Sequence, residues 1–495
     1  MKYSKADSGK NKSHRPASKS GTARRSGTEA ETFLGGTFWR EHALRDIIPY
    51  WHEHIRDEKH GAFYTNLSQE GQPLSPWDKV PAMISRQVFG FSAAYLLFGE
   101  MKYLEIAREG ADYLMEHAWD KKNGGWFDRV TQSGEPKANT KNISLQLYTN
   151  VGLTLYYFTT GDNKALSHIK NSIEIQQTHG HDNEFEGYYQ ELNMDLSVKD
   201  SGKNKHAHFG YVGSLLLNLW LCTRSAEILK WESHLSDLSL NKMTDDRDGW
   251  INGYISRFDR QWNLIPGIVN GAEVVHMGAQ LTAALSFLRL YHQTGRAVYL
   301  EKGKALGDMI NRYGWEPENG GWLELVERTC AHRPASRPEV QWWIQIYGSF
   351  LQLQLYRLTG DDQYLERFKK SEDFFFRYFI DREHGSIFST VSPEGALIGD
   401  AGKAREWRTS YHEMEHALLN HLYVNLYVNR DPATLHFMFE NTGSREKHFV
   451  SLIDDPSVQI AGVKINGRPW TQFDASERSV ILPEGKNLKV EVLLK

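Results

Sequence analysis

Apolar residues recur at helical spacing through most of this chain, in segments of two kinds that alternate. Segments that are apolar almost throughout predict helices buried on every side, and they occupy residues 214–222, 279–291 and 346–356. Amphipathic segments, each opening on a turn and carrying apolar residues at i, i+3 and i+4, begin near residues 98, 160, 294 and 359. Their spacings are one, two and one periods of about 65 residues. The pattern predicts buried inner helices paired with half-exposed outer helices.

A second repeated pattern, an acidic or Asn-containing turn followed by glycine and aromatic residues, has the same period. Clear copies occupy 57–64, 120–127, 182–189, 317–324 and 381–388, and a weaker copy lies at 248–259. Anchoring on Gly61, Gly125, Gly187, Gly253, Gly321 and Gly385 gives steps of 64, 62, 66, 68 and 64 residues. Six such helical pairs predict an all-α (α/α)6 barrel, with an open-ended superhelical solenoid as the alternative.

The pattern changes after Asn429, where apolar and polar residues alternate as in strands. Asn466-Gly467 is a hairpin-type turn within this region. We therefore expect three parts: a disordered basic tail at 1–31, the (α/α)6 barrel at 32–430, and a small all-β domain at 431–495.

Composition narrows the class of protein further. Residues 1–30 hold five Lys and three Arg against Asp7 and Glu29, but the whole chain of 495 residues carries a net charge of −4, so we expect no nucleic-acid partner. No apolar run reaches the roughly 20 residues of a membrane helix. The two cysteines, Cys222 and Cys330, have no CxxC partner, which favours a cytoplasmic protein without a disulfide framework.

Polar residues stand near the start of successive apolar helices at the same period. His208, His276, Gln345 and His412 are separated by 68, 69 and 67 residues. A single histidine at such a position is most often structural, but three in phase favour a shared site at one mouth of the barrel. The same offset, continued towards the N-terminus, leads to Tyr148 and Arg86.

These groups suit proton transfer on a sugar. Imidazole has a pKa near ambient pH and can take the proton from carbon next to a carbonyl. A second imidazole on the opposite face, here His276 opposite His412, can return it without metal or cofactor. Arg86 and the third histidine can stabilise the enediolate oxygen.

At these residues the chain resembles the N-acylglucosamine 2-epimerase superfamily, which includes cellobiose 2-epimerases and aldose–ketose isomerases acting on mannose. The resemblance covers roughly residues 35–428 and implies a carbohydrate substrate. It also implies the following roles: a barrel-mouth arginine, a histidine that assists substrate binding or ring opening, two catalytic histidines, a tryptophan pair and a tryptophan before the second catalytic histidine. The matching residues are, in that order, Arg86, His208, His276 and His412, Trp342 and Trp343, and Trp407. With Tyr148, Gln345, Tyr347 and Glu415, they form the predicted site.

Two positions depart from the family pattern. The family usually has Glu three residues after the first catalytic histidine and after the WWxQ motif, where this chain has Ala279 and Tyr347. Glu415, one turn beyond His412, or Glu273 could take over the role of these carboxylates.

Three other readings stay open at this point. HEMEH at 412–416 satisfies HExxH, with His412 and His416 as zinc ligands and Glu413 as base. A glycoside hydrolase or lyase could occupy the same toroid but would need two carboxylates facing the sugar. A non-catalytic glycan-binding protein could use the aromatic residues for stacking. The sequence does not separate C2 epimerisation from aldose–ketose isomerisation, identify the sugar, or distinguish a monomer from a homodimer.

Overall fold

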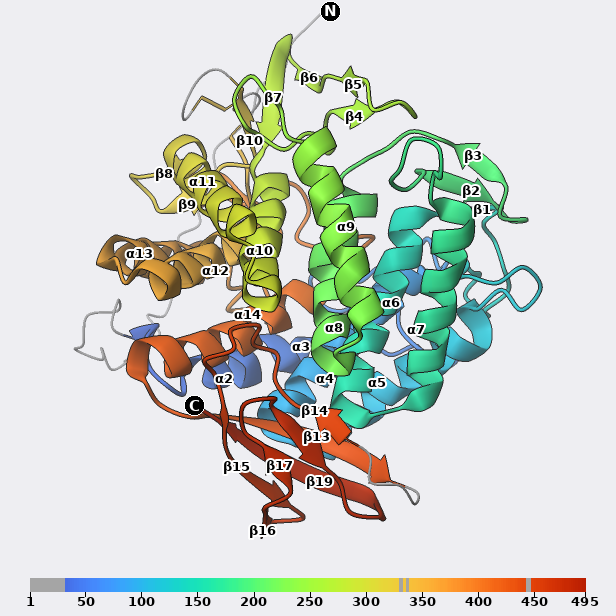
Figure 1. The fold of residues 1–495 in the computed structure, drawn as a ribbon, viewed down its shortest axis with the longest axis vertical. Helices are drawn as coiled ribbons and strands as arrows, with labels where there is room; N and C mark the ends of the chain where they lie inside the picture. The colour runs from blue at the N-terminus through green and yellow to red at the C-terminus, as the bar shows by residue number, and fades with distance from the viewer. Residues whose placement is uncertain (1–31, 329–332, 335–337, 442–446) are drawn as a thin grey trace, which may run out of the picture.

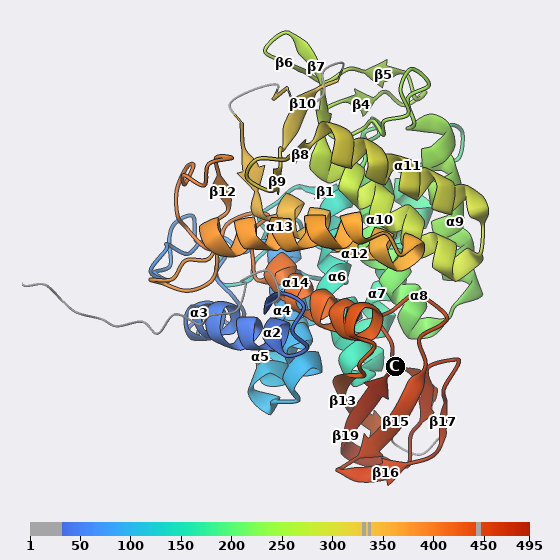
Figure 2. The ribbon, with the colours of Figure 1, turned by 90° about the vertical axis from the view of Figure 1, so that its left-hand side faces the viewer.

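A computed structural model describes residues 32–328, 333–334, 338–441 and 447–495 of the chain. The predicted tail at 1–31 and Cys330 lie outside these residues. The described chain forms helical hairpins around a common axis, followed by a small β domain (Figure 1, Figure 2).

The inner wall of the barrel is a ring of six helical segments, each packed against the next. They are α4 (Pro81–Phe98), α6 (Ile143–Thr160), the π-helical η4 (His206–Leu216) continued by α8 (Leu217–Thr223), α10 (Met277–Thr294), α12 (Trp342–Thr359) and α14 (Tyr411–Tyr423) continued by η5 (Val424–Asn429). Because α14 packs against α4, the ring is closed. The predicted (α/α)6 barrel is confirmed, and the open solenoid is wrong.

Outer helices pack on this ring. They are α2 (Phe38–His42) continued by η1 (Ala43–Ile47) and α3 (Ile48–His54), α5 (Met101–Tyr113) with η2 (Leu114–Ala118), α7 (Asn163–Ile175) with η3 (Gln176–Gly180), α9 (Ala226–Lys242), α11 (Ala297–Tyr313) and α13 (Asp362–Tyr378). Five of them form hairpins with the inner helix that precedes them, whereas α2 packs against α14. Trp51 donates from Nε1 to Glu413 at 2.9 Å, and the Asn425 amide donates to the Gly36 carbonyl at 3.0 Å. The sixth hairpin is thus built from the first and last helices of the barrel.

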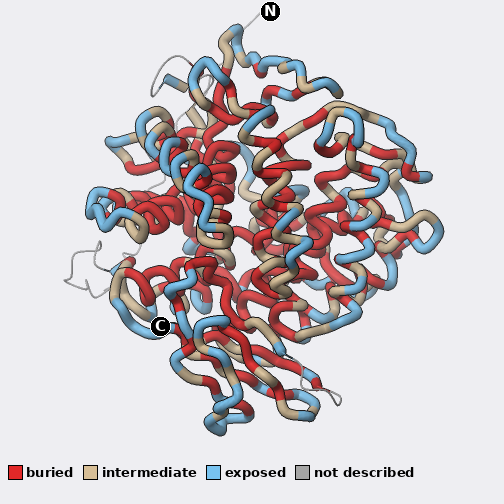
Figure 3. The backbone as a smooth tube through the Cα atoms, viewed as in Figure 1, coloured by how far each residue is buried: buried red, intermediate tan, exposed pale blue. Residues whose placement is uncertain are grey.

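The inner helices are buried along nearly their whole length, as Figure 3 shows. Most of them end in a glycine with left-handed backbone, such as Gly99 at φ 69° and Gly360 at φ 68°, whose N–H caps the last turn. Glycine adopts this conformation without a Cβ clash, so the chain turns directly into the outer helix. The connections from outer to inner helices are much longer, and they gather at the opposite mouth.

A buried ion pair secures most of these long connections. The aspartate that opens the acidic turn meets a lysine that stands shortly before the next inner helix. The carboxylate-to-ammonium distances are 3.0 Å for Asp57–Lys79, 3.1 Å for Asp120–Lys141, 3.1 Å for Asp182–Lys203 and 2.8 Å for Asp381–Lys403. In the turn at Asp245 the cation is Arg328, at 2.8 Å. The period noted in the sequence is therefore the period of a structural clamp.

The weaker copy of the turn is displaced from its predicted place at 248–259. The turn is closed by the Gly249 N–H, which donates to the Asp245 carbonyl at 2.7 Å, as Gly124 donates to Asp120 at 2.8 Å. Gly253, the predicted anchor, lies four residues later. A tyrosine follows Gly253, as aromatic residues follow the glycines of the other copies, so the two sites look alike in the sequence.

Short strands line the mouth that holds the long connections. They are β1 (Thr140–Asn142), β2 (Glu191–Asn193), β3 (Val198–Asp200), β4 (Arg257–Phe258), β5 (Leu264–Ile265), β6 (Ile268–Val269), β7 (Ala272–His276), β8 (Trp315–Glu316), β9 (Gly321–Trp322), β10 (Leu325–Glu327), β11 (Val340–Gln341) and β12 (Thr390–Val391). All the pairs they form are antiparallel.

The C-terminal part forms two antiparallel sheets, as predicted for an all-β domain. One sheet has the order β13 (Ala433–Asn441), β19 (Gly485–Leu494), β15 (Ile460–Ile465) and β16 (Arg468–Trp470). The other has the order β14 (Lys447–Phe449), β18 (Ser479–Ile481) and β17 (Phe473–Asp474). Asn466-Gly467 joins β15 to β16 with positive φ at both residues, which confirms the predicted hairpin turn. The domain packs against α4, α6 and α8, at the mouth opposite the long connections.

The buried clamps yield a test of stability. Asp120→Asn removes the charge that compensates Lys141, whose side chain is 1% exposed, and should lower the free energy of unfolding by about 3 kcal/mol. Denaturant titration measures this change. The exposed i,i+4 pair Asp373–Arg377 is the matched control, and Asp373→Asn should cost no more than about 1 kcal/mol. Equal losses in the two variants would contradict the structural role of the clamp.

Candidate active site

A cavity of about 410 Å³ lies among the N-terminal ends of the inner helices. Seven of the residues predicted from the sequence line it: Arg86, Tyr148, Trp342, Trp343, Tyr347, Trp407 and His412. They come from α4, α6, α12, α14 and the connection before α14. Segments far apart in the sequence are thus brought to one site by ring closure.

Arg86 is fixed by aromatic rings and a backbone carbonyl. Its guanidinium carbon lies 4.5 Å from the ring centroid of Tyr148, 5.4 Å from that of Trp407 and 5.2 Å from that of Tyr411. Nη1 donates to the Trp407 carbonyl at 2.9 Å. Trp407 is in the left-handed region at φ 70°, a strained conformation for a tryptophan that turns this carbonyl to the arginine. The charge of Arg86 is held in place by groups that do not neutralise it.

His412 forms an imidazole–carboxylate pair at the cavity wall. Its Nδ1 lies 3.2 Å from Oε2 of Glu415, one helical turn further along α14. Burial lowers the pKa of His412, and Glu415 partly offsets this by favouring the charged form. The imidazole is therefore neutral at pH 7, and the contact with Glu415 leaves Nε2 as the nitrogen that can act as a base.

His276 occupies a different setting, at the N-cap of α10. Its Nδ1 accepts from the Ala279 N–H at 3.2 Å, and its Nε2 lies 3.4 Å from Oε1 of Glu324. Burial lowers its pKa, partly offset by Glu324. The Tyr254 ring lies 4.0 Å away, centroid to centroid, and it lines the large cavity while His276 borders a small one of about 10 Å³ behind it. Tyr254 thus separates His276 from the main cavity.

Trp343 contacts both predicted catalytic imidazoles. Its ring stacks on His276 at 5.8 Å and 21°, and on His412 at 6.2 Å and 25°. The two imidazole centroids are therefore no further apart than the sum of 5.8 Å and 6.2 Å.

The structure does not bring His208 and Gln345 into the cavity. His208 accepts the Tyr188 N–H at Nε2, at 3.0 Å, and its Nδ1 donates to the Asn204 carbonyl at 2.6 Å. Gln345 pairs in the same way with the Trp322 backbone, donating and accepting at 2.8 Å. Both side chains hold the preceding turn, and burial lowers the pKa of His208 to about 3.

The register error has a simple cause. His208 and Gln345 are equivalent to Gln146 and Gln280, which bind the Trp126 and Ile251 backbones. In its own repeat, His276 stands four residues before the equivalent residue, Gln280. In the last repeat the equivalent residue is Glu413, and His412 stands one residue before it. The period of about 68 residues therefore joined positions that differ by up to one helical turn.

Comparison with known proteins identifies the relatives of this barrel. The family model described as N-acylglucosamine 2-epimerase (GlcNAc 2-epimerase) matches residues 41–415. The chain belongs to this family. The expected class, an enzyme of the sugar 2-epimerase and isomerase family, is thereby confirmed, and the match ends before β13 of the β domain begins.

Individual relatives agree with the family match. A cellobiose 2-epimerase of Bacteroides fragilis is 25% identical over 74% of this chain and 93% of its own length. The human N-acylglucosamine 2-epimerase is 23% identical, over 72% and 84%. Solved structures of a Bacillus thermoamylovorans cellobiose 2-epimerase and of a D-mannose isomerase superpose with a TM-score of 0.69 each, at 21% and 19% identity. They cover 79% and 78% of this chain and 99% and 98% of their own chains, which supports the barrel fold.

The two departures from the family pattern now have a structural context. Ala279 donates its N–H to His276, and Tyr347 lines the cavity with its ring 5.2 Å from that of His412. Of the two proposed substitutes, Glu415 contacts His412, but Glu273 pairs with Arg247 at 2.7 Å. The carboxylate beside His276 is Glu324 instead, which the pairing of β7 with β10 brings next to it.

Several cavity residues were missed in the sequence, namely Asn142, Gln190, Asn204, Lys205, His206 and Tyr254. Asn204 could have been predicted from the repeat. It stands four residues before His208, as His276 stands four residues before the equivalent Gln280. Lys205 and His206 adjoin it at the start of η4. Tyr254 lies in a connection without helical pattern, and the sequence marks it only as the aromatic residue that follows Gly253 in the weaker copy of the turn.

Lys205 is the most unusual of the missed residues. It is 2% exposed, and its Nζ lies 5.7 Å from the Tyr254 ring centroid. Burial, reinforced by the Arg86 guanidinium, lowers its pKa to about 7. Next to it, burial and the charges of Lys205 and Arg86 hold the pKa of His206 well below 6.5, and His206 Nδ1 has no hydrogen-bond partner among the described residues.

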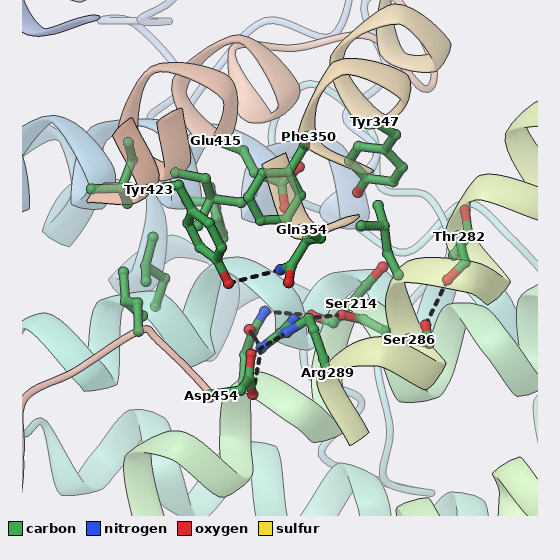
Figure 4. A pocket seen from close by; sticks show the side chains of 18 residues that line it. Ser214, Thr282, Ser286, Arg289, Tyr347, Phe350, Gln354, Glu415, Tyr423 and Asp454 are labelled. Atoms are coloured by element: carbon green, nitrogen blue, oxygen red, sulfur yellow. Dashed lines mark hydrogen bonds and ion pairs between the residues drawn. The ribbon is translucent and has the colours of Figure 1, made fainter. Parts of the chain in front are cut away.

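A second cavity of about 70 Å³ adjoins the first, and Ser214, Thr282 and Tyr347 line both (Figure 4). Its wall includes Glu415. A segment of the β domain closes it with Asp454, which is bound by Arg289 Nε at 2.6 Å. The larger cavity, and not this one, is lined by His412, Arg86 and the three tryptophans Trp342, Trp343 and Trp407.

The HEMEH side chains point to separate partners. His416 Nε2 lies 2.9 Å from Glu372 in the barrel core, and Glu413 accepts from Trp51 and Ser386. His412 and His416 therefore do not share a site. Among the described residues there is no cluster of His, Cys, Asp or Glu that could hold a metal ion, and none of their helices is long and apolar enough to span a bilayer.

The placement of His208 can be tested by replacing it. His208→Gln restores the residue found in equivalent turns and should leave the free energy of unfolding within about 1 kcal/mol, with catalytic activity retained. His208→Leu leaves the buried Tyr188 N–H without an acceptor and should cost about 1–3 kcal/mol. Denaturant titration and a turnover assay measure both effects. A stable but inactive His208→Gln variant would show that this histidine contributes to the chemistry.

Proposed function

We propose that this enzyme moves the proton at C2 of an aldose through an enediolate, with His412 and His276 as the two proton-transfer groups and no cofactor. The observation that carries the proposal is the His412–Glu415 pair at the wall of a cavity that also holds Arg86. The family relatives named as epimerases and as an isomerase support the substrate class.

In this mechanism neutral His412 takes the C2 proton of the open-chain sugar through Nε2, and Glu415 orients the ring and stabilises the imidazolium. The carbonyl oxygen becomes an enediolate oxygen, whose negative charge Arg86 stabilises. Trp343, Trp407 and Tyr148 provide faces on which the sugar can lie.

The second proton transfer assigns a role to Tyr254. His276 can reach C2 only when the Tyr254 ring moves away from the imidazole that it covers. Contact of both imidazoles with the Trp343 ring supports a substrate position beside this ring, within reach of both histidines. Return of a proton to C2 from the opposite face gives the epimer, and return to C1 gives the ketose.

A glycoside hydrolase fits the cavity less well. Hydrolysis needs two carboxylates at the scissile bond, and no Asp or Glu is among the described residues that line this cavity.

Deuterium exchange tests the mechanism. Incubation with a panel of aldoses and ketoses in heavy water, read by NMR, should show deuterium at C2 of an aldose product or at C1 of a ketose product. His412→Ala and His276→Ala should each lower kcat/KM by about 100-fold to 10,000-fold, the usual contribution of a general acid or base, without unfolding the protein. The exposed His52 supplies the control, and His52→Ala should leave the rate unchanged. Unimpaired exchange in both active-site variants would falsify the two-histidine mechanism.

The Glu415 carboxylate should be visible in the pH dependence. Glu415 raises the pKa of His412, so Glu415→Gln lowers that pKa further below 6.5. Since His412 acts as a neutral base, the acid limb of the kcat/KM profile should move to lower pH while the plateau falls. A profile that keeps its acid limb in Glu415→Gln would indicate that the limb belongs to another group.

A further inference from the structure

Two cations face the active-site cavity, and neither has an acidic partner among the described residues. Arg86 contacts rings and a carbonyl, and the Lys205 ammonium forms no ion pair or hydrogen bond there that would compensate its charge. No carboxylate contributes to the pKa of Lys205, whose only charged influence is Arg86. Both side chains are at most 5% exposed, so solvent compensates them poorly.

Other buried lysines of this barrel show what is missing at Lys205. Lys79, Lys141, Lys203 and Lys403 each have an aspartate within 3.1 Å. Lys203 stands only two residues away and is bound by Asp182. The fold thus supplies an aspartate to each lysine that secures a connection, whereas Lys205 has no such aspartate among the described residues.

The remaining wall of the cavity does not provide the counter-charge. Its described lining residues include amides, hydroxyls, aromatic rings and histidines, but no carboxylate. The two carboxylates nearest the chemistry, Glu324 and Glu415, lie against His276 and His412 at 3.4 Å and 3.2 Å. An anion in the cavity would meet two charges that the protein leaves free.

We propose that Lys205, together with Arg86, binds an anionic group of the substrate, so that the sugar converted here carries a carboxylate or a phosphate. The inference rests on the proposed function and narrows its substrate class. Asn142, Asn204 and Gln190 at the same wall provide amides for the neutral hydroxyls. Binding of the anion stabilises both cations, because it supplies the counter-charge that no described residue of the cavity wall provides.

The substrate class is tested with matched neutral and anionic sugars. D-Mannose and N-acetyl-D-glucosamine are compared with D-mannose 6-phosphate and D-glucuronate, by deuterium exchange and by quenching of tryptophan fluorescence from Trp343 and Trp407. At least one anionic sugar should bind and react with a kcat/KM about 10-fold or more above that of its neutral counterpart. The phosphate and carboxylate arms identify which anion the site accepts.

Two lysine variants separate substrate binding from a structural role. Lys205→Met should lower the anionic-to-neutral ratio of kcat/KM by about 10-fold or more, and Lys205→Arg should largely restore it. Lys205→Met should also raise Tm, because it removes a buried charge without a partner. Lys141→Met is the control, and it should lower Tm because it leaves Asp120 uncompensated.

The outcomes distinguish the two proposals. Exchange with neutral sugars, together with no binding of either anionic sugar, would overturn the anion site and leave the proposed function standing. Lysine-dependent binding of an anionic sugar without any exchange would support the anion site and refute the proposed function. Equal losses for both sugar classes in Lys205→Met, or a fall in its Tm, would also overturn the inference.

Discussion

The site depends on a constraint that recurs around the ring, the buried ion pair between a turn aspartate and the lysine that precedes the next inner helix. A lysine whose ammonium is enclosed in protein must stay close to its counter-charge, so the pair fixes the connection to the helix that follows. The glutamine or histidine in the first turn of that helix then binds the backbone of the loop that contains the turn aspartate. Together they hold the starts of the inner helices at one mouth, where the cavity lies.

This scheme also explains why the polar side chains of the active-site cavity gather at one mouth. Along the barrel axis the inner helices satisfy their own backbone groups and bury apolar side chains against one another. Near their first turns, irregular connections bring in amides, carbonyls and charged groups from several repeats. The strained Trp407 backbone, which presents its carbonyl to Arg86, is one product of these connections.

The sequence predicted the helical ring and the β domain, because hydrophobic spacing and the repeated turn reflect interactions that every repeat must make. It located the site less accurately. Connections between outer and inner helices differ in length, so a single period cannot align the repeats exactly. His208 occupies the position of Gln280 in the next repeat, whereas His276 stands one helical turn before that position. Tyr254 and Glu324 could not be found at all from one sequence, since their contact with His276 depends on how the chain crosses the mouth.

The hairpin built from the first and last helices has a consequence for how the protein is made. On the ribosome, α2 and α3 emerge long before α14. The hydrogen bond from Trp51 to Glu413 can form only after all the intervening repeats have been synthesised. His412 belongs to that last helix. Under the proposed mechanism, a nascent chain therefore lacks its catalytic base until α14 has been synthesised and can join the two ends of the barrel.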